Sequence, residues 1–282
     1  MQKSVIARIS GGGQYSSKQG FTLAEVLITL GIIGIVASLT LPQLIKNYNG
    51  RILETQFKKA YATAAQVILL SKNELGVSYL AKHCADVAED YESYEDGTTN
   101  GVEPYPNSSN CYTTLYKSLN KSSTSVNGWD KDKYTVERKD PIRTFNNKAE
   151  VSNGLGLAGA GNPWVMRQNR DGIWMQFRIN EGKLYITFDV NGYKRPNQLG
   201  HDIFILYVDK KNDNITGIQQ SKAYTDEELE NEHFDKEYQQ ARAGNPCNKT
   251  SSQKANGIGC SWFAINDINP ETGKAGYWKN LP

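Results

Sequence analysis

The sequence has little excess charge of either sign. Its 282 residues include 32 Lys and Arg against 30 Asp and Glu, a formal net charge of +2. A site for a phosphate backbone needs a concentrated basic stripe, so this balance argues against nucleic-acid binding. The mean hydropathy of −0.59 excludes a protein with many membrane spans but leaves room for one. With 38% hydrophobic residues, the composition is that of a folding chain.

Motifs of common enzymes and metal sites are also scarce. The sequence has no CxxC pair, no HExxH helix and no GxSxG nucleophile elbow, and it has only three histidines. A GxGxxG match at 154–159 lacks a preceding apolar strand, and Asn162-Pro163 follows where a nucleotide-binding helix should begin. The sequence therefore predicts neither an enzyme nor a cofactor. A catalytic triad assembled in space leaves no such motif, so that alternative stays open.

One long apolar run lies near the N-terminus. Residues 21–41 read FTLAEVLITLGIIGIVASLTL and contain one charge, Glu25. As a helix rising about 1.5 Å per residue, this run spans roughly 31 Å, enough to cross a bilayer. The residues before it include Lys3, Arg8 and Lys18 and no acidic residue. Positive charge ahead of an apolar run holds that end in the cytoplasm.

Two simple interpretations compete for this run, a plain signal anchor and a secretory signal peptide cut after Val36-Ala37-Ser38. Glu25 argues against both, because an unpaired carboxylate in hydrocarbon costs at least ~2.5 kcal/mol. A cut between Gly20 and Phe21 would instead create an α-amino group one helical turn from Glu25. The amine of a neighbouring subunit could then pair with this carboxylate.

Lys18-Gln19-Gly20, followed by Phe21-Thr22-Leu23-Ala24-Glu25 and an unbroken apolar stretch, resembles the prepilin cleavage and methylation signature of type IV pilins and type II secretion pseudopilins. The resemblance covers about Lys18–Ile45. It implies that a prepilin peptidase and methyltransferase cuts after Gly20 and N-methylates Phe21. Glu25 would then recruit and register the incoming subunit. Pro42 sits where similar chains carry a helix-kinking proline.

The resemblance also implies partners and a location. The partners would be other pilin or pseudopilin subunits and an inner-membrane assembly platform. The chain would cross the bacterial inner membrane once, with its head outside the cytoplasm, before entering a pilus or pseudopilus. It divides into a leader (1–20), a transmembrane and assembly helix (21–42), an amphipathic stem helix (43–76) and a globular head (77–282).

Helical spacing of apolar residues resumes after Pro42 and a weak point at Asn47–Gly50. The apolar positions are Leu53, Phe57, Ala60, Tyr61, Ala64, Val67 and Ile68. Gly76 and Ser78 mark the expected end of this helix. Its apolar stripe predicts a sheet packed against it.

Apolar or alternating runs at 173–179, 184–190, 203–208 and 215–218 predict strands, and short turns between them require antiparallel neighbours. The expected fold is α+β, a long helix packed on an antiparallel meander at about 173–218. One face of this sheet would cover the helix and the other would meet solvent.

The loop 189–202 offers a calcium candidate in Asp189, Asn191 and Asp202, whose side chains are hard oxygen ligands. This loop resembles a stretch found in pseudopilin heads, and some pseudopilins hold calcium in a loop near the sheet. The spacing is not that of an EF-hand, and Lys194 and Arg195 oppose cation binding. An Asx-stabilised turn without an ion is therefore the favoured interpretation.

Four cysteines, Cys84, Cys111, Cys247 and Cys260, suit an oxidising compartment. Three connectivities are possible, and the local one, Cys84–Cys111 with Cys247–Cys260, requires the fewest assumptions. Each bridge would close a loop-rich region without obvious strands. The C-terminal loop is similar to the disulfide-closed region that pilins expose as a variable surface.

Two charged segments predict exposed structure. An acidic block at 86–103 reads as a solvated loop, and 225–242 has mixed charge and the character of an exposed helix.

The predicted function is that of a pilin-like structural subunit. The alternative is a secreted or membrane-anchored binding or enzymatic domain whose N-terminus is only a targeting device. The sequence does not distinguish a major from a minor subunit, nor secretion from motility, adhesion or DNA uptake.

Overall fold

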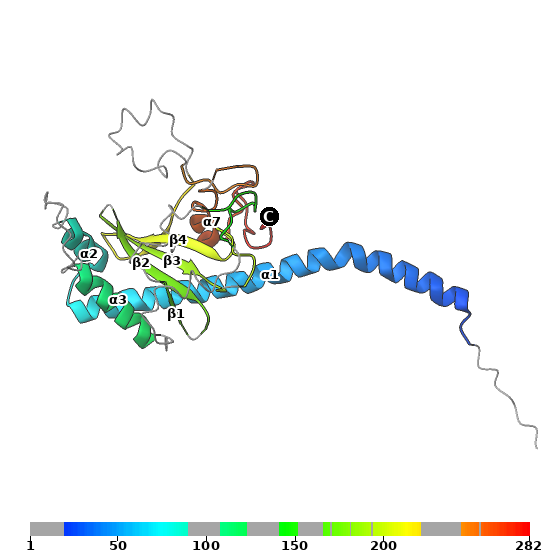
Figure 1. Cartoon of the computed structure of the whole chain (residues 1–282), viewed down its shortest axis with the longest axis horizontal. Coiled ribbons are helices and arrows are strands. Elements are labelled where there is room, and N and C mark those ends of the chain that lie inside the picture. The colour runs from blue at the N-terminus through cyan, green and yellow to red at the C-terminus, as the bar shows by residue number, and fades with distance from the viewer. Residues whose placement is uncertain are drawn as a thin grey trace, which may run out of the picture. The chain divides into compact units, whose positions relative to one another are not determined.

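The computed structural model describes residues 20–89, 108–122, 141–151, 166–169, 171–180, 182–192, 194–220, 244–253 and 255–282. The chain forms two compact units, Met1–Ile45 and Lys46–Pro282. The helices are α1 (Leu23–Leu75), α2 (Leu80–Glu89), α3 (Ser108–Ser122) and α7 (Cys260–Asn266). The strands are β1 (Arg167–Gln168), β2 (Trp174–Asn180), β3 (Lys183–Asp189), β4 (Ile203–Val208) and β5 (Ile215–Gly217) (Figure 1).

Helix α1 is continuous over 53 residues. The expected weak point at Asn47–Gly50 is wrong, because the helix runs without a break through this segment and through Pro42. A proline removes one backbone hydrogen bond, and the long helical segments on both sides hold the remaining ones. The helix ends where predicted, since Gly76 adopts a left-handed backbone conformation with φ of 66°.

The five strands form one antiparallel sheet in the order β1-β2-β3-β4-β5, which confirms the predicted meander. Phe188 at the centre of the sheet pairs with Met175 on one side and Phe204 on the other. Because side chains alternate along a strand, this register places a continuous apolar set on one face.

The second half of α1 packs on that apolar face, as the fold prediction required. Leu53, Phe57, Ala60, Ala64 and Val67 are all buried in the same core as the sheet. The ring of Phe57 lies 4.7 Å from the ring of Phe204 and 6.2 Å from that of Phe188, centroid to centroid. The Tyr61 hydroxyl donates a hydrogen bond of 3.0 Å to the Ile215 carbonyl. These contacts make the helix an integral part of the head.

The opposite face of the sheet differs from the prediction, because it is not open to solvent. Gln176 and Thr187, which are cross-strand neighbours on this face, are buried. Tyr185 and Tyr207 beside them are half-buried. The polar side chains on this face, which suggested contact with solvent, are therefore buried or half-buried.

Helices α2 and α3, which were not predicted from the sequence, close one end of the sheet (Figure 1). Asp213, in the β4–β5 turn, accepts the backbone N–H groups of Leu80 and Ala81 at 3.0 and 2.9 Å and pairs with Lys72 at 3.2 Å. Its carboxylate thus joins α1, the first turn of α2 and the sheet. A carboxylate at a helix N-terminus is also favoured by the helix dipole.

Among the described residues, β1 pairs with β2 only at Trp174 and Met175, so the rest of that β2 edge has no strand partner within this part of the chain. There the hydroxyl oxygens of Tyr112 and Tyr116, on α3, accept the N–H groups of Ile179 and Phe177 at 2.7 and 3.4 Å. An open strand edge invites pairing with another chain, so these tyrosines protect the edge.

Helix α7 and the C-terminal segment close the other edge and the other end. The N–H of Ile218 donates to Ser261 Oγ at 2.8 Å, and a Cβ at Gly217 would collide with the backbone of Trp262. Trp278 lies 5.3 Å from Phe57, ring to ring, and its carbonyl oxygen occupies the place that a Cβ at Gly50 would need. Gly50 is therefore a close contact between α1 and the C-terminal segment.

The loop before β4 carries a buried histidine at this same end. His201 Nε2 lies 3.0 Å from the Phe145 carbonyl, and its ring lies 5.3 Å from that of Phe145. The neighbouring Gly200 carbonyl accepts a hydrogen bond from the Tyr277 hydroxyl. Burial lowers the pKa of His201 to about 4, the hydrogen bond to Phe145 opposes this shift, and the charge of Lys46 adds to it.

Substitution Gly50→Ala tests the contact with the C-terminal segment. Alanine favours a helix by about 1 kcal/mol over glycine, but the new Cβ would overlap the Trp278 carbonyl, and overpacking costs about 1–3 kcal/mol. We expect a net loss of stability, measured as a lower Tm of the full chain in detergent. Gly34→Ala in the same helix is the control, because nothing lies within 4 Å of its added Cβ. An unchanged or higher Tm for Gly50→Ala would contradict the contact.

The buried His201 predicts a loss of stability in mild acid. Its pKa is lower in the folded than in the unfolded chain, so the unfolded chain alone takes up a proton as pH falls from about 6.5 towards about 4. The free energy of unfolding should fall by a few kcal/mol across this window through His201. Urea unfolding at several pH values should give His201→Gln a shallower pH dependence than the wild type. Parallel curves for both proteins would refute this account.

Candidate processing and assembly site

The proposed cleavage position lies just before the start of α1. Gly20 is exposed, and Phe21 exposes 89% of its surface. The helix begins only at Leu23, so the backbone of Gly20 and Phe21 is not part of its hydrogen-bonded ladder. A peptide bond in this position is accessible to a protease.

Thr22 and Glu25 form a reciprocal cap on the first turn of α1. Glu25 Oε2 accepts the Thr22 backbone N–H and the Thr22 hydroxyl, both at 2.9 Å, and Thr22 Oγ1 accepts the Glu25 N–H at 3.2 Å. This is the capping-box arrangement, in which a threonine and a glutamate three residues later satisfy free N–H groups of the helix end. The spacing Thr-x-x-Glu in the sequence is the local signal of this cap.

The cap gives Glu25 a role within its own chain. The expectation that Glu25 has no partner within its own chain is therefore wrong, because its carboxylate accepts two hydrogen bonds from Thr22. Both bonds end on Oε2, and Oε1 takes part in none among the residues that the structure describes. One carboxylate oxygen caps the helix, and the other can accept a proton donor from a second molecule.

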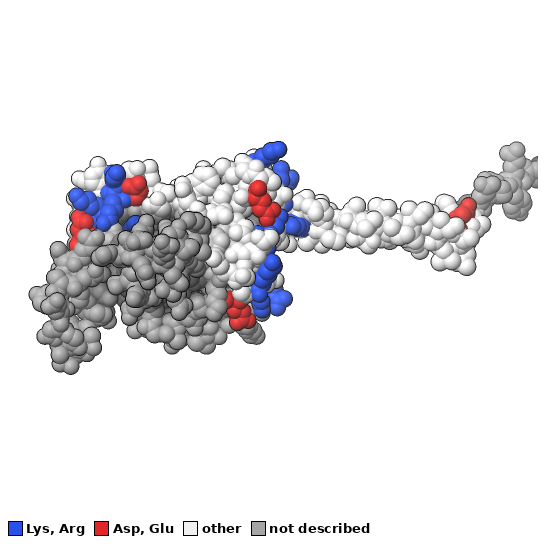
Figure 2. Space-filling view, turned by 90° about the horizontal axis from the view of Figure 1, so that it is seen from above, with Lys and Arg blue, Asp and Glu red and all other residues white. Residues whose placement is uncertain are grey.

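The first half of α1 has the properties of a membrane span. It contains an 18-residue window with a mean hydropathy of 2.2, none of which is buried inside the protein. Figure 2 shows this part of α1 as a white rod with one acidic residue near its start. The hydroxyls of Thr29, Ser38 and Thr40 donate to carbonyls of the same helix at 2.8–2.9 Å. Each of these three hydroxyls therefore has a hydrogen-bond acceptor within the helix, as a polar group in lipid requires.

The calcium candidates in loop 189–202 form a hydrogen-bonded turn. Asp202 accepts the N–H groups of Asn197 and Gln198, both at 2.7 Å, and Asp189 accepts that of Gly192 at 2.8 Å. Asn191 donates to the Arg195 carbonyl at 3.2 Å. Among the described residues, no group of three or more His, Cys, Asp or Glu side chains is arranged to hold a metal ion. These contacts are those of the Asx-stabilised turn, the interpretation that the sequence favoured.

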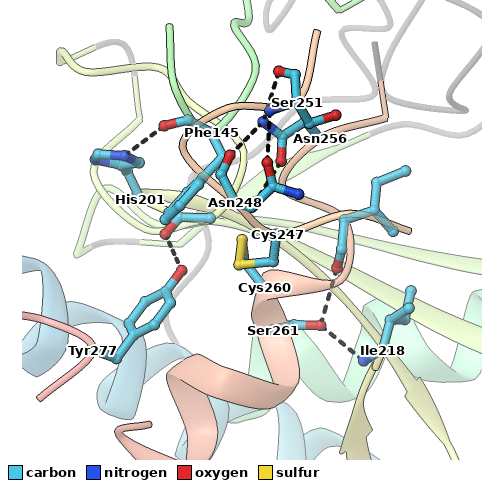
Figure 3. Close-up of a disulfide and its surroundings, with 12 residues drawn as sticks. Phe145, His201, Ile218, Cys247, Asn248, Ser251, Asn256, Cys260, Ser261 and Tyr277 are labelled. Atoms are coloured by element: carbon cyan, nitrogen blue, oxygen red, sulfur yellow. Dashed lines mark hydrogen bonds between the residues drawn. A yellow bond between two sulfur atoms is a disulfide. The ribbon is translucent and has the colours of Figure 1, made fainter. Parts of the chain in front are cut away.

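The cysteines are joined as Cys84–Cys111 and Cys247–Cys260, with Cα–Cα distances of 5.7 and 5.0 Å. The first bridge links α2 to α3, and most of the segment that it closes, residues 90–107, lies outside the described residues, so the predicted loop-rich character of that segment stays a prediction. The second bridge lies in the interior, between the end of one loop and the start of α7 (Figure 3).

The loop that the second bridge closes is held by side-chain amides. Asn248 Oδ1 accepts the Ser251 N–H at 2.6 Å, and Asn256 Nδ2 donates to the Asn248 carbonyl at 2.9 Å (Figure 3). Asn256 itself is fully buried. The expected exposed, variable loop is therefore in part a component of the core.

Several sequence predictions lie outside the described residues. These are the leader before Gly20, the GxGxxG match at 154–159, most of the acidic block at 86–103 and the predicted helix at 225–242.

Comparison with protein families finds the prokaryotic N-terminal methylation motif at residues 15–41. This motif is the signature of type IV pilins and pseudopilins, and it fits a processed, membrane-anchored subunit with a single span. It suggests a structural subunit rather than an enzyme. Searches of curated proteins and of solved structures found no match to the chain.

Proposed function

We propose that the chain is a pilin-like structural subunit that assembles into a type IV pilus or a type II secretion pseudopilus. A prepilin peptidase cuts between Gly20 and Phe21, Phe21 is N-methylated, and an inner-membrane platform adds the subunit to the filament. The observation that carries this proposal is the methylation motif at 15–41 on a helix that continues unbroken from an exposed apolar segment into a folded head.

The two halves of α1 support this division of labour. Large apolar side chains of the first half are exposed, whereas Leu53, Phe57 and Val67 of the second half are buried in the head. An exposed apolar helix is stable in lipid and also in a bundle of identical helices, so it can pass from one to the other without meeting water. Glu25, with Oε1 available, offers the methylated amine of a neighbouring Phe21 an ion pair in a low-dielectric setting.

The orientation proposed here, with the head outside the cytoplasm, draws its support from the two disulfides. Disulfides persist in oxidising compartments such as the periplasm and are rare in the cytosol. The charges flanking the span give little support by themselves. Three basic residues precede the span, and Lys46, Arg51, Lys58 and Lys59 follow it within about twenty residues, the distance over which such charges act.

The N-terminus of the mature protein tests the processing step. We expect mass spectrometry of the membrane fraction to find N-methylated Phe21 when a prepilin peptidase is co-expressed and an intact leader when it is absent. A mature protein that begins at Leu39 would support a secretory signal peptide instead. An intact Met1 in the presence of the peptidase would support the alternative of an anchored binding or enzymatic domain.

Three substitutions separate the charge of Glu25 from its capping role. Glu25→Gln removes the charge but keeps a side chain that can close a capping box, and Glu25→Ala removes both. Thr22→Ala keeps the charge of Glu25 but removes the threonine cap, which lowers the stability of the helix by about 1 kcal/mol. We expect both Glu25 variants to be inserted and processed yet depleted from sheared filaments, and Thr22→Ala to assemble nearly as wild type. The readout is the ratio of filament to membrane protein in quantitative immunoblots.

The result for Glu25→Gln decides between the two roles. If this variant assembles like the wild type while Glu25→Ala does not, capping rather than charge is what assembly requires. Wild-type assembly by both Glu25 variants would remove Glu25 from the assembly step altogether.

A further inference from the structure

One edge of the sheet is protected by side chains of a helix. The N–H groups of Phe177 and Ile179, on β2, donate to the hydroxyl oxygens of Tyr116 and Tyr112, on α3. Donors two residues apart on a strand point to the same side, and two tyrosines four residues apart on a helix lie on one face. The two hydroxyls therefore take the place of a neighbouring strand along this part of β2.

The described polar contacts between α3 and α1 are weak. Lys117 pairs with Glu74 at the surface, and exposed ion pairs contribute little to stability. The Ser71 hydroxyl donates to the Thr114 carbonyl at 3.4 Å, which is long for a hydrogen bond. A helix of 15 residues is also marginal in water by itself. Helix α3 therefore depends on being held against the head.

A covalent bond holds α3 at its first turn. Cys111 lies in this turn, directly before Tyr112, and forms a disulfide with Cys84 in α2. Tyr116 follows Tyr112 by one turn of the helix, so the bridge lies close to both hydroxyls along α3. Both cysteines are buried. The bridge thus fixes the part of α3 that carries the edge contacts.

Helix α2, the other side of the bridge, is itself anchored to the sheet. Asp213, in the β4–β5 turn, accepts the N–H groups of Leu80 and Ala81 at 3.0 and 2.9 Å and pairs with Lys72 at 3.2 Å. A continuous path of contacts therefore leads from the β4–β5 turn through α2 and α3 to the β2 edge. The disulfide is the step that joins the two helices.

We propose that the Cys84–Cys111 disulfide is a latch that closes the β2 edge once the head has reached an oxidising compartment. Before oxidation, α3 leaves and rebinds this edge, so the N–H groups of Phe177 and Ile179 are open to a strand of another chain. After oxidation the bridge keeps the tyrosine hydroxyls in place. The inference uses contacts within the head alone, and it does not depend on cleavage at Gly20 or on filament assembly.

Closing the latch is a thiol–disulfide exchange with a disulfide as the oxidant. One cysteine thiolate attacks the disulfide of the oxidant, and the other then attacks the mixed disulfide that results. The oxidant leaves as a dithiol that carries the two electrons and, after protonation, the two protons of the cysteines. Because both cysteines are buried once α3 is packed, the finished bridge is shielded from thiols. The latch is therefore set during folding and stays set.

Hydrogen exchange at the β2 edge tests the latch. The full chain in detergent is transferred to D₂O, and fragmentation in the mass spectrometer resolves single amides. In Cys84→Ala/Cys111→Ala, the amides of Phe177 and Ile179 should exchange on the order of a hundredfold faster than in the wild type, because the lost bridge spans 27 residues. The amides of β4, which has a strand on each side, should exchange at the wild-type rate.

A second variant removes the hydroxyls and keeps the bridge. Tyr112→Phe/Tyr116→Phe retains both rings and the disulfide, so the two β2 amides should exchange about fivefold faster, the effect of one lost hydrogen bond each. Tyr61→Phe is the matched control, because its hydroxyl bonds to the Ile215 carbonyl on β5 instead. It should leave the two β2 amides at the wild-type rate.

Three results would overturn the latch. Unchanged exchange at the β2 edge without the bridge would show that α3 holds itself in place. Equally faster exchange in β4 would show that the bridge stabilises the whole head and not this edge. Unchanged exchange in the double phenylalanine variant would show that the hydroxyls do not protect the edge.

Discussion

The fold depends on the burial of one side chain, Phe57. Its ring contacts the centre of the sheet at Phe188 and Phe204 and the C-terminal segment at Trp278, at centroid distances of 4.7–6.2 Å. A buried aromatic ring of this kind contributes several kcal/mol, because it removes a large apolar area from water and its neighbours cannot close the space it leaves. Helix, sheet and C-terminus therefore form as one cooperative unit.

Helix α1 meets two solvents, and its residues show how one element satisfies both. In the first half the hydroxyls of Thr29, Ser38 and Thr40 donate to carbonyls of the same helix, and one oxygen of the single carboxylate accepts the hydrogen bonds of the Thr22 cap. In the second half small residues, Ala60 and Ala64, bring the helix close to the sheet, while polar positions such as Lys58 stay outside. The same helix, Leu23–Leu75, thus carries two kinds of surface along its length.

The sequence allowed the sheet and the stem to be predicted because both depend on local periodicity. The predicted strand at 203–208 has the observed bounds, and those at 173–179 and 184–190 are displaced by one residue. Helix α3 was missed, although Tyr112, Leu115, Tyr116 and Leu119 follow helical spacing, because polar residues dominate the rest of it. Helix α7, with seven residues, is too short to show a period. The break expected at Gly50 was wrong for another reason. Glycine marks a weak point in an isolated helix, but here it permits a contact with Trp278 that lies more than two hundred residues away.

The same difference between local patterns and long-range contacts explains which interactions the sequence could predict. The residues proposed for processing and registry, Gly20, Phe21 and Glu25, lie in one short stretch, so the sequence alone was enough to propose them. The carboxylate of Asp213 could not be foreseen in the same way, because it accepts the backbone N–H groups of Leu80 and Ala81 from a turn more than one hundred residues later in the chain. No local pattern connects these partners, so only the folded chain shows that one carboxylate holds the start of α2 on the sheet.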